Sequence, residues 1–339
     1  MSIGSGVVLQ GAYEPPLFQE MVREIDQLGF DRLWLTDSSL HARNAYAYLT
    51  LAALTSSRLG LGTAVTNPLT RHPAITAASA ATVDEISNGR FVLGIGAGDR
   101  PLLALGMKPA PVDSLRASIA ATRALWRGER VSVTDRVFTL DDAHLRFEAR
   151  SGIDIYIAAS GPRMLELAGE VADGVILLVG LFPEAIAWAL DHVDRGAAEA
   201  GRPRPHIAVF AYGAIDQDQG RALESARSIA AWFPQTAPVI CELAGLPYEL
   251  VQEVRERYAG GEFQEAGSAA SLLPDEFVRR VALAGDRTLA LEHIREAAAA
   301  GADSVHVFPL GHGRMETVRA FAGCVAELAE TSHTEREIP

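Results

Sequence analysis

The stretch LGLGTAVTNPLTRHPAI, residues 59–75, begins like a buried β-strand and ends like the start of a helix. Its apolar residues stop at Val65, and the polar and rigid run TNP follows at 66–68. Proline has a fixed φ and disfavours helix at the preceding residue, so this run predicts that the strand ends here. From these residues alone, two interpretations stay open. The run is either an ordinary turn with a solvated helix start at Arg71-His72, or a functional site at a strand end.

Seven other short apolar runs resemble the strand at 59–64, and helical patterns separate them. Several of these runs are hydrophobic almost throughout, as in parallel strands covered on both faces. One intervening helix is predicted at 15–29, with Leu17, Met21, Ile25 and Leu28 as its buried stripe and Gly29 at its end. The eight predicted strands are 6–9, 32–36, 59–64, 90–95, 153–158, 174–179, 207–212 and 304–308. Eight such units and a last helix at 315–328 indicate an α/β fold, a (β/α)8 TIM barrel, rather than an open sheet.

Two segments depart from the repeating pattern. Residues 131–147, VSVTDRVFTLDDAHLRF, alternate and turn at Asp135-Arg136, which predicts a hairpin before the fifth barrel strand. Residues 217–285 contain only helical and glycine-rich pieces, so we expect a helical insertion after the seventh strand that forms a lid or a dimer contact. The predicted organisation is a single domain at 1–330 and a flexible tail at 331–339.

Composition restricts the partners of the chain. The formal net charge is -13, which repels nucleic acid and anionic membranes. Cys241 and Cys324 lie far apart without metal-like spacing, so neither a disulfide framework nor a metal site is expected. The sequence shows no leader pattern and no apolar run of about 18 residues. We therefore expect a cytoplasmic protein with a small-molecule substrate.

In a barrel of this type, binding groups gather at the carboxyl ends of the strands. Four predicted strands end in polar or glycine-rich residues. These ends are Thr36-Asp37-Ser38, Val65-Thr66-Asn67, GIGAGDR at 94–100 and Ala159-Ser160-Gly161. We expect the four ends to meet at one mouth.

The glycine run at 94–100 has several interpretations. A ligand-binding loop and a simple tight turn are equally compatible with it. A dinucleotide-binding loop fits poorly, because the spacing lacks the third glycine of that motif, no helix pattern opens directly after it, and no suitable acidic residue follows. Residues 160–165, SGPRML, form a second candidate anion site at a helix start, or an ordinary capped connection.

The residues quoted above, extended over 33–99, resemble the luciferase-like superfamily of flavin- and deazaflavin-dependent oxidoreductases. The most specific parts are TNPLTRHPAI at 66–75 and DEISNGRFVLGIGAGD at 84–99, and LELAGEVADGVIL at 165–177 agrees with the same family. Within the superfamily, the chain is most similar to the methylenetetrahydromethanopterin reductase-like group, which uses coenzyme F-420.

The resemblance implies a cofactor site. A non-prolyl cis peptide at Ala64-Val65 would form a bulge behind the central ring of the cofactor. Asp37 and Asp99 would be the carboxylates nearest the ring and the candidate proton donors. The remaining cofactor contacts implied are Thr66, Asn67, Gly96, Ala97, Gly98, Ser160, Gly161 and Met164.

Two positions depart from the pattern of the resembled family. Ser38 stands where many relatives have histidine, and His41, one helical turn on, is the nearest substitute for a substrate contact. Gln10 follows the first strand, where the methanopterin reductase carries a glutamate. The resemblance therefore implies the fold and the cofactor class, but not the substrate.

The expected activity is hydride transfer between coenzyme F-420 and a small imine, enone, ketone or alcohol. One alternative is an FMN-dependent monooxygenase that uses O2. Another is a non-catalytic barrel that binds a flavin or deazaflavin. Family members are commonly dimers, so a homodimer is expected.

Overall fold

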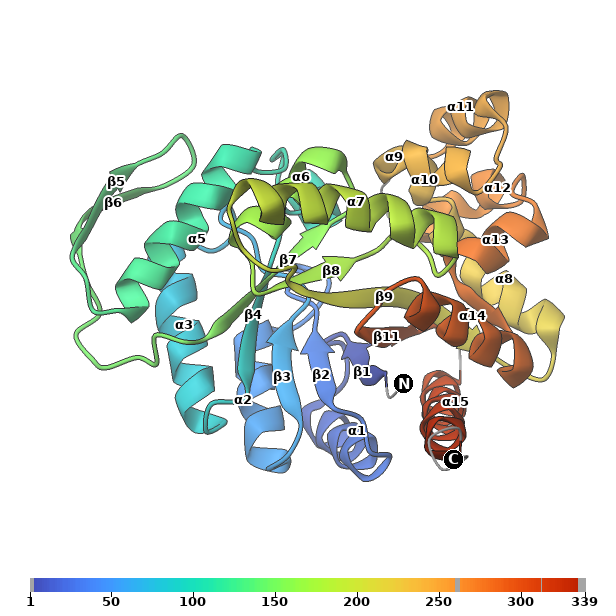
Figure 1. Cartoon of the computed structure of the whole chain (residues 1–339), viewed down its shortest axis with the longest axis horizontal. Coiled ribbons are helices and arrows are strands. Elements are labelled where there is room, and N and C mark those ends of the chain that lie inside the picture. Colours follow the sequence, from blue (N-terminus) through green and yellow to red (C-terminus); the bar gives the residue numbers. More distant parts are fainter. Residues whose placement is uncertain (1–2, 260–262, 312, 335–339) are drawn as a thin grey trace.

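The computed structural model describes residues 3–259, 263–311 and 313–334. Within these residues, eight parallel strands close into a barrel (Figure 1). The barrel strands are β1 Gly4–Leu9, β2 Arg32–Leu35, β3 Gly60–Thr63, β4 Phe91–Ile95, β7 Asp154–Ala159, β8 Gly174–Leu177, β9 His206–Ile215 and β11 Ser304–Pro309. Closure comes from β9, which pairs with both β8 and β11, and from β11, which pairs with β1. The predicted TIM barrel is therefore confirmed.

Helices surround the strands and bury one face each. They are α1 Pro15–Gln27, α2 Ala45–Thr55, α3 Pro73–Ile86, α5 Val112–Trp126, α6 Pro162–Val171, α7 Pro183–Glu199, α14 Arg287–Ala299 and α15 Arg314–Thr334. The buried face of α1 consists of Phe18, Met21, Val22 and Ile25, whereas Leu17 is 48% exposed. The predicted stripe was wrong at Leu17, because Phe18 and Val22 lie one turn apart with Met21 and Ile25 on an adjacent face, and that face packs inward.

The two departures from the barrel lie where the sequence predicts them. The hairpin of β5 Val131–Thr134 and β6 Thr139–Ala143 is antiparallel and extends away from the barrel in Figure 1. His72 caps α3 through its Nδ1 atom, and its Nε2 atom lies 3.0 Å from the Thr139 carbonyl oxygen. This contact ties the hairpin to the start of α3.

The insertion after β9 is helical except at its end. Its elements are α8 Gln219–Ala230, α9 Phe233–Thr236, α10 Pro238–Leu243, α11 Tyr248–Arg257, η1 Phe263–Ala266, α12 Gly267–Ala270, α13 Asp275–Val281 and β10 Leu283–Gly285. The expectation of only helical and glycine-rich pieces was wrong at β10, which pairs with the last three residues of β9. Because β9 continues past the residues that pair with β8, it leaves an edge that this short strand covers.

Two boundaries also differ from the sequence expectation. A short helix, α4 Arg100–Leu103, opens directly after the glycine run, where no helix was expected. Four residues with a proline at the second position are too few for helical periodicity to reveal. At the other end, α15 continues to Thr334, so the first four residues of the predicted tail at 331–339 are helical. Residues 335–339 lie outside the described residues.

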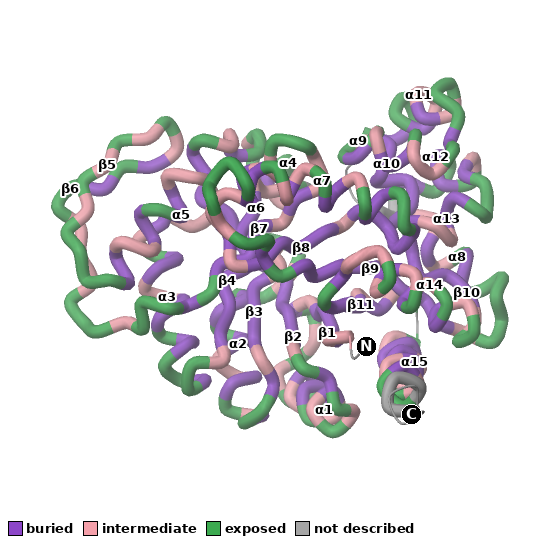
Figure 2. The backbone as a smooth tube through the Cα atoms, viewed as in Figure 1, coloured by how far each residue is buried: buried purple, intermediate pink, exposed green. Residues whose placement is uncertain are grey.

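The interior of the barrel is a separate apolar cluster centred on Trp34, which is fully buried. Figure 2 shows the strands as buried along most of their length. A Cβ atom at Gly62 would lie 2.3 Å from the indole ring, so only glycine at this position leaves room for Trp34. Tyr156 and Phe210 pack against the same indole, with ring centroids 5.7 and 5.3 Å away. The strands therefore close around one large aromatic side chain.

A buried histidine completes this interior. Trp34 Nε1 donates a hydrogen bond to His306 Nδ1 at 3.1 Å, and His306 Nε2 lies 2.8 Å from Ser304 Oγ. Indole N–H can only donate, so Nδ1 must accept and the imidazole is neutral. Burial first, then the charges of Arg32 and His206, lower the pKa of His306 well below its usual range. Protonation of His306 would place two N–H groups against each other.

This arrangement predicts a stability loss on acidification. Unfolded His306 takes up a proton below about pH 6.5, whereas the folded form does not, so the unfolded state gains protons as the pH falls. The free energy of unfolding should therefore fall more steeply in the natural chain than in His306→Gln, by up to about 1.4 kcal/mol per pH unit. Urea titrations between pH 7.5 and 5.5 measure the two slopes. Equal slopes would show that His306 titrates normally.

Candidate functional site

A cavity of about 480 Å³ opens at the carboxyl ends of the barrel strands. From the β2 and β3 ends it is lined by Asp37, Ser38, Ala64, Val65 and Asn67. From the β4 and β7 ends it is lined by Gly96, Ala97, Gly98, Asp99, Ser160, Gly161 and Met164. The four strand ends that the sequence singled out thus meet at one cavity.

The end of β3 contains a β-bulge. Gly62 pairs with Val92 and Thr66 pairs with Ile95, so three residues of one strand oppose two of the other. Pairing resumes at Thr66, whose N–H donates to the Gly94 carbonyl at 3.0 Å. The extra residue lies in the segment that contains the Ala64–Val65 peptide bond, which is cis. Both residues of that bond line the cavity.

The glycine run after β4 accommodates this bulge. A Cβ atom at Gly94 would lie 1.9 Å from the Thr63 carbonyl oxygen, and one at Gly96 would lie 3.0 Å from the Val65 side chain. Thr63 Oγ1 also donates to the Gly94 carbonyl at 2.7 Å. Gly98 has φ +91°, which favours glycine. Therefore Gly94 permits the bulge, while Gly96 and Gly98 form a cavity wall without side chains.

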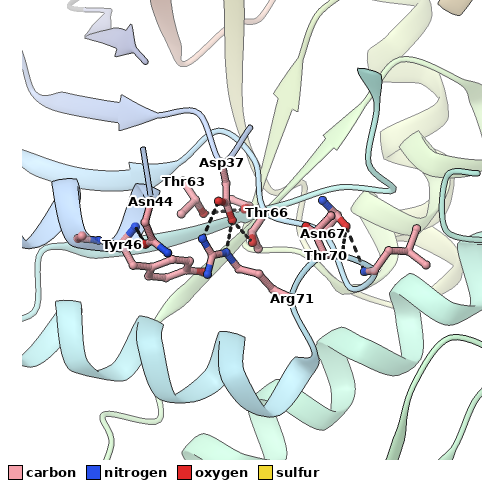
Figure 3. Close-up of polar contacts among 11 residues, drawn as sticks. Asp37, Asn44, Tyr46, Thr63, Thr66, Asn67, Thr70 and Arg71 are labelled. Atoms are coloured by element: carbon pink, nitrogen blue, oxygen red, sulfur yellow. Dashed lines mark hydrogen bonds and ion pairs between the residues drawn. The ribbon is translucent and has the colours of Figure 1, made fainter. Parts of the chain in front are cut away.

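Asp37, which lines the cavity, is anchored by Arg71 and Thr66 (Figure 3). Arg71 Nε and Nη2 donate to its two carboxylate oxygens at 2.5 and 2.8 Å, and Thr66 Oγ1 donates at 2.6 Å. The Asp37 side chain is 3% exposed. This bidentate pair links the end of β2 to the loop before α3. The interpretation of Arg71 as part of a solvated helix start is thus wrong.

The Tyr46 ring packs against the Arg71 guanidinium, whose central carbon lies 4.8 Å from the ring centroid. Burial first, and then Asp37, raise the pKa of the Tyr46 phenol, so it stays neutral at physiological pH. The ion pair is therefore covered by an aromatic ring, which limits the access of water to it.

Asn67 uses its amide oxygen within its own loop. That oxygen accepts from the N–H groups of Leu69 and Thr70 at 3.1 and 2.9 Å. Only the side-chain NH2 group remains as a donor toward a ligand. Asn67 is buried and lines the cavity, so its orientation is fixed by the turn.

Two predicted site residues do not line the cavity. Thr66 lies behind the wall, where it binds Asp37, and His41 is exposed. Asp99 does line the cavity but is exposed to solvent before α4. Thr66 therefore supports the site by binding Asp37 and does not itself line the cavity.

Helix α6 begins at the cavity with Gly161 as its N-cap and Pro162 in its first turn. No side chain caps the helix, and a Cβ atom at Gly161 would have nothing within 4 Å. The open N-terminus of a ten-residue helix can accept an anionic group such as a phosphate.

Apart from Gln10, the strand ends that form the opposite wall of the cavity were not predicted from the sequence. This wall includes Gln10 after β1, Ile176 and Leu178 at β8, Phe210 and Tyr212 in β9, and Phe308 in β11. Binding groups gather at the carboxyl ends of these strands as well, but their residues are mostly apolar and so resemble ordinary core residues in the sequence. Trp232 and Thr236 from the insertion complete this wall.

The described part of the chain contains no group of three His, Cys, Asp or Glu side chains arranged to hold a metal ion. In the same residues, no helix is both long and apolar enough to cross a membrane. The cavity itself has an anion-accepting end at α6 and a glycine-walled slot beside the bulge.

A closed parallel barrel with a cavity at the carboxyl ends of its strands defines a (β/α)8-barrel protein with a ligand site. The profile of the family described as luciferase-like monooxygenase matches residues 7–304, and the chain belongs to this family. The chain is 33% identical over 308 residues to a 5,10-methylenetetrahydromethanopterin reductase of Archaeoglobus fulgidus, covering 88% of this chain and 91% of that protein. It is 32% identical over 231 residues to an F-420-dependent glucose-6-phosphate dehydrogenase of Beutenbergia cavernae, covering 61% and 66%.

A solved structure agrees with these relatives. The coenzyme F-420-dependent tetrahydromethanopterin reductase from Methanopyrus kandleri superposes with a TM-score of 0.83 at 26% identity, covering 95% of this chain and 98% of that one. An F-420-dependent secondary alcohol dehydrogenase superposes with a TM-score of 0.78, but its 20% identity supports the fold alone.

The ion pair between Asp37 and Arg71 should stabilise the fold. Arg71→Met would leave a buried carboxylate without its partner, which should lower the free energy of unfolding by about 3–5 kcal/mol. Arg127→Met serves as the control, since Arg127 pairs with Glu129 at the surface and its loss should cost less than about 1 kcal/mol. Urea denaturation at pH 7 compares the two. If the free energy of unfolding falls by the same small amount in both variants, the Asp37–Arg71 pair does not stabilise the fold.

Proposed function

We propose that this chain is a coenzyme F-420-dependent oxidoreductase that transfers a hydride between the deazaflavin ring and a small organic substrate. The observation that carries the proposal is the bulged β3 end, whose Ala64-Val65 bond forms one wall of the cavity beside a glycine-walled slot. The F-420-dependent relatives support the cofactor class.

The cavity residues fit such a cofactor. The ring would lie against Ala64 and Val65, with the Asn67 NH2 group at its polar edge. Gly96, Ala97 and Gly98 would flank the ribityl chain, and the open start of α6 at Gly161 would accept the phosphate. Ser160 and Met164 would border the same chain. When bound, the deazaflavin supplies a hydride donor or acceptor, so no side-chain nucleophile is required.

The protein positions the reactants and handles the proton. The bulge at Ala64 and Val65 would set how deeply the cofactor enters the cavity, and the apolar wall opposite would hold the substrate against it. Asp37 and Asp99 are the proposed catalytic carboxylates, with different roles. Since Asp37 already accepts hydrogen bonds from Arg71 and Thr66, we propose that it orients polar groups, and that exposed Asp99 relays the proton between substrate and solvent. Ser38 lies in the cavity where it can contact substrate.

An FMN-dependent monooxygenase is the second candidate, because the matched family is described as luciferase-like monooxygenase. Three relatives at 30% identity or more are two 5,10-methylenetetrahydromethanopterin reductases and an F-420-dependent glucose-6-phosphate dehydrogenase, which favours hydride transfer. A non-catalytic carrier is less well supported, since both predicted catalytic carboxylates line the cavity together with all predicted cofactor contacts except Thr66.

We further propose a homodimer in the cytoplasm that binds no nucleic acid, consistent with its net charge of -13. Residues 1–330 would form one domain, because one apolar cluster includes core residues of both the barrel and the insertion. In this proposal the 217–285 insertion forms part of the cavity wall and a subunit contact.

Paired binding titrations test the cofactor proposal. The apoprotein should bind F-420 at micromolar concentration or tighter and FMN at least about tenfold more weakly, followed by quenching of tryptophan fluorescence. Gly161→Asp should weaken F-420 binding by about tenfold or more, because a carboxylate at the α6 N-cap would compete for the same amides. Gly267→Ala, in an open position of the insertion, is the control and should bind normally. Tighter binding of FMN would favour the monooxygenase.

A further inference from the structure

The cavity has two walls of different chemistry. The proposed cofactor contacts come from the ends of β3, β4 and β7, which are neighbours in the barrel. The opposite wall comes from β8, β9, β11 and β1, which form the rest of the ring apart from β2. A planar ligand on the first wall would therefore turn its other face toward the second.

The second wall is apolar, and its side chains pack against one another and against the barrel interior. Phe210 packs edge-on against Trp34, and Tyr212 packs against Phe308 with ring centroids 5.0 Å apart. Ile176 belongs to the same interior cluster as Phe210. These contacts hold the rings in place, so the wall presents a fixed surface to a substrate.

The insertion closes this wall with Trp232. Its indole is 8% exposed and packs edge-on against Phe233, with ring centroids 5.6 Å apart. Thr236 Oγ1 donates to the Trp232 carbonyl at 3.0 Å, which fixes the turn that carries the indole. Trp232 and Thr236 both line the cavity, so the insertion limits the size of the substrate.

The second wall carries no charge. Among the cavity-lining residues whose side chains the structure describes, none is Lys, Arg or His, and the carboxylates are Asp37 and Asp99. Asp37 is neutralised by Arg71, and Asp99 lies on the cofactor side. A phosphate or carboxylate on the substrate would lose its hydration here without gaining a counter-charge, which is costly. The available polar groups, such as the Gln10 amide and the Ser38 hydroxyl, are uncharged and suit a carbonyl oxygen.

Space limits the substrate further. A volume of about 480 Å³ lies toward the lower end of the range of ~300–1,000 Å³ for small-molecule sites. The same space has to hold the tricyclic ring and the reacting part of the substrate.

Resting on the proposed function, we infer that the substrate is a small, uncharged, largely apolar ketone or the corresponding secondary alcohol. It would bind between the cofactor ring and the wall formed by Phe210, Phe308 and Trp232, with its oxygen toward Gln10. In one direction the hydride moves from the reduced cofactor to the carbonyl carbon and a proton from solvent goes to the oxygen. In the other direction the hydride moves from the carbinol carbon to the oxidised cofactor, and the proton of the hydroxyl group goes to solvent.

The first experiment separates this inference from the proposed function. F-420 binding is measured alone, and a failure there overturns the proposed function together with the inference. The protein saturated with oxidised F-420, which holds no hydride to donate, is then titrated calorimetrically with cyclohexanone, 4-oxocyclohexanecarboxylate and glucose 6-phosphate. We expect cyclohexanone to bind on the order of 100-fold more tightly than either anion. Equal or tighter binding of an anion, or no binding of cyclohexanone to the loaded protein, overturns the inference and leaves the proposed function standing.

Variants of the second wall test its role. Trp232→Ala should weaken cyclohexanone binding about tenfold and leave F-420 binding unchanged. Tyr248→Ala is the control, because Tyr248 belongs to the same insertion, is 71% exposed and lies outside the cavity lining. Phe308→Leu repeats the test from β11 without altering the insertion. Unchanged cyclohexanone binding in both wall variants, or an equal loss of F-420 binding, would contradict the assignment of this wall to the substrate.

Discussion

The ion pair between Asp37 and Arg71 joins the end of β2 to the loop before α3, and the candidate site is built around it. Thr66 binds the same carboxylate and, through its backbone, resumes the pairing of β3 with β4 after the bulge. The carboxylate therefore fixes where the bulge ends and how Asn67 enters the cavity. Because Asp37 is almost fully buried, its charge is tolerated only with these partners present.

Glycine makes this arrangement sterically possible. The missing side chain of Gly94 leaves room for the Thr63 carbonyl oxygen, and that of Gly62 leaves room for the Trp34 indole. A larger residue at either position would clash with these groups. The glycine run that looked like either a turn or a ligand loop serves both purposes. Its first glycine belongs to the packing of the bulge, and its later glycines belong to the cavity.

Much of the fold could be predicted because parallel barrel strands are short apolar runs at regular intervals, and the strand-end rule then located Asp37, Asn67 and Gly161. Other features depend on tertiary contacts that no local pattern records. The three residues of β10 are too short to show periodicity, and the placement of Thr66 behind the wall depends on the bulge. The apolar wall around Phe210 was missed because apolar residues at strand ends look like ordinary core.

The luciferase-like fold carries both oxygen-dependent and hydride-transfer chemistry, so the reaction has to be decided by measurement. The most direct test uses reduced F-420 in which both hydrogens on C5 are replaced by deuterium. The protein is given this cofactor and a neutral ketone, once under argon and once in air. Mass spectrometry of the product should find an alcohol with one deuterium on the carbinol carbon, at the same rate in both atmospheres. A product that forms only in air and contains oxygen from O2 would contradict the account.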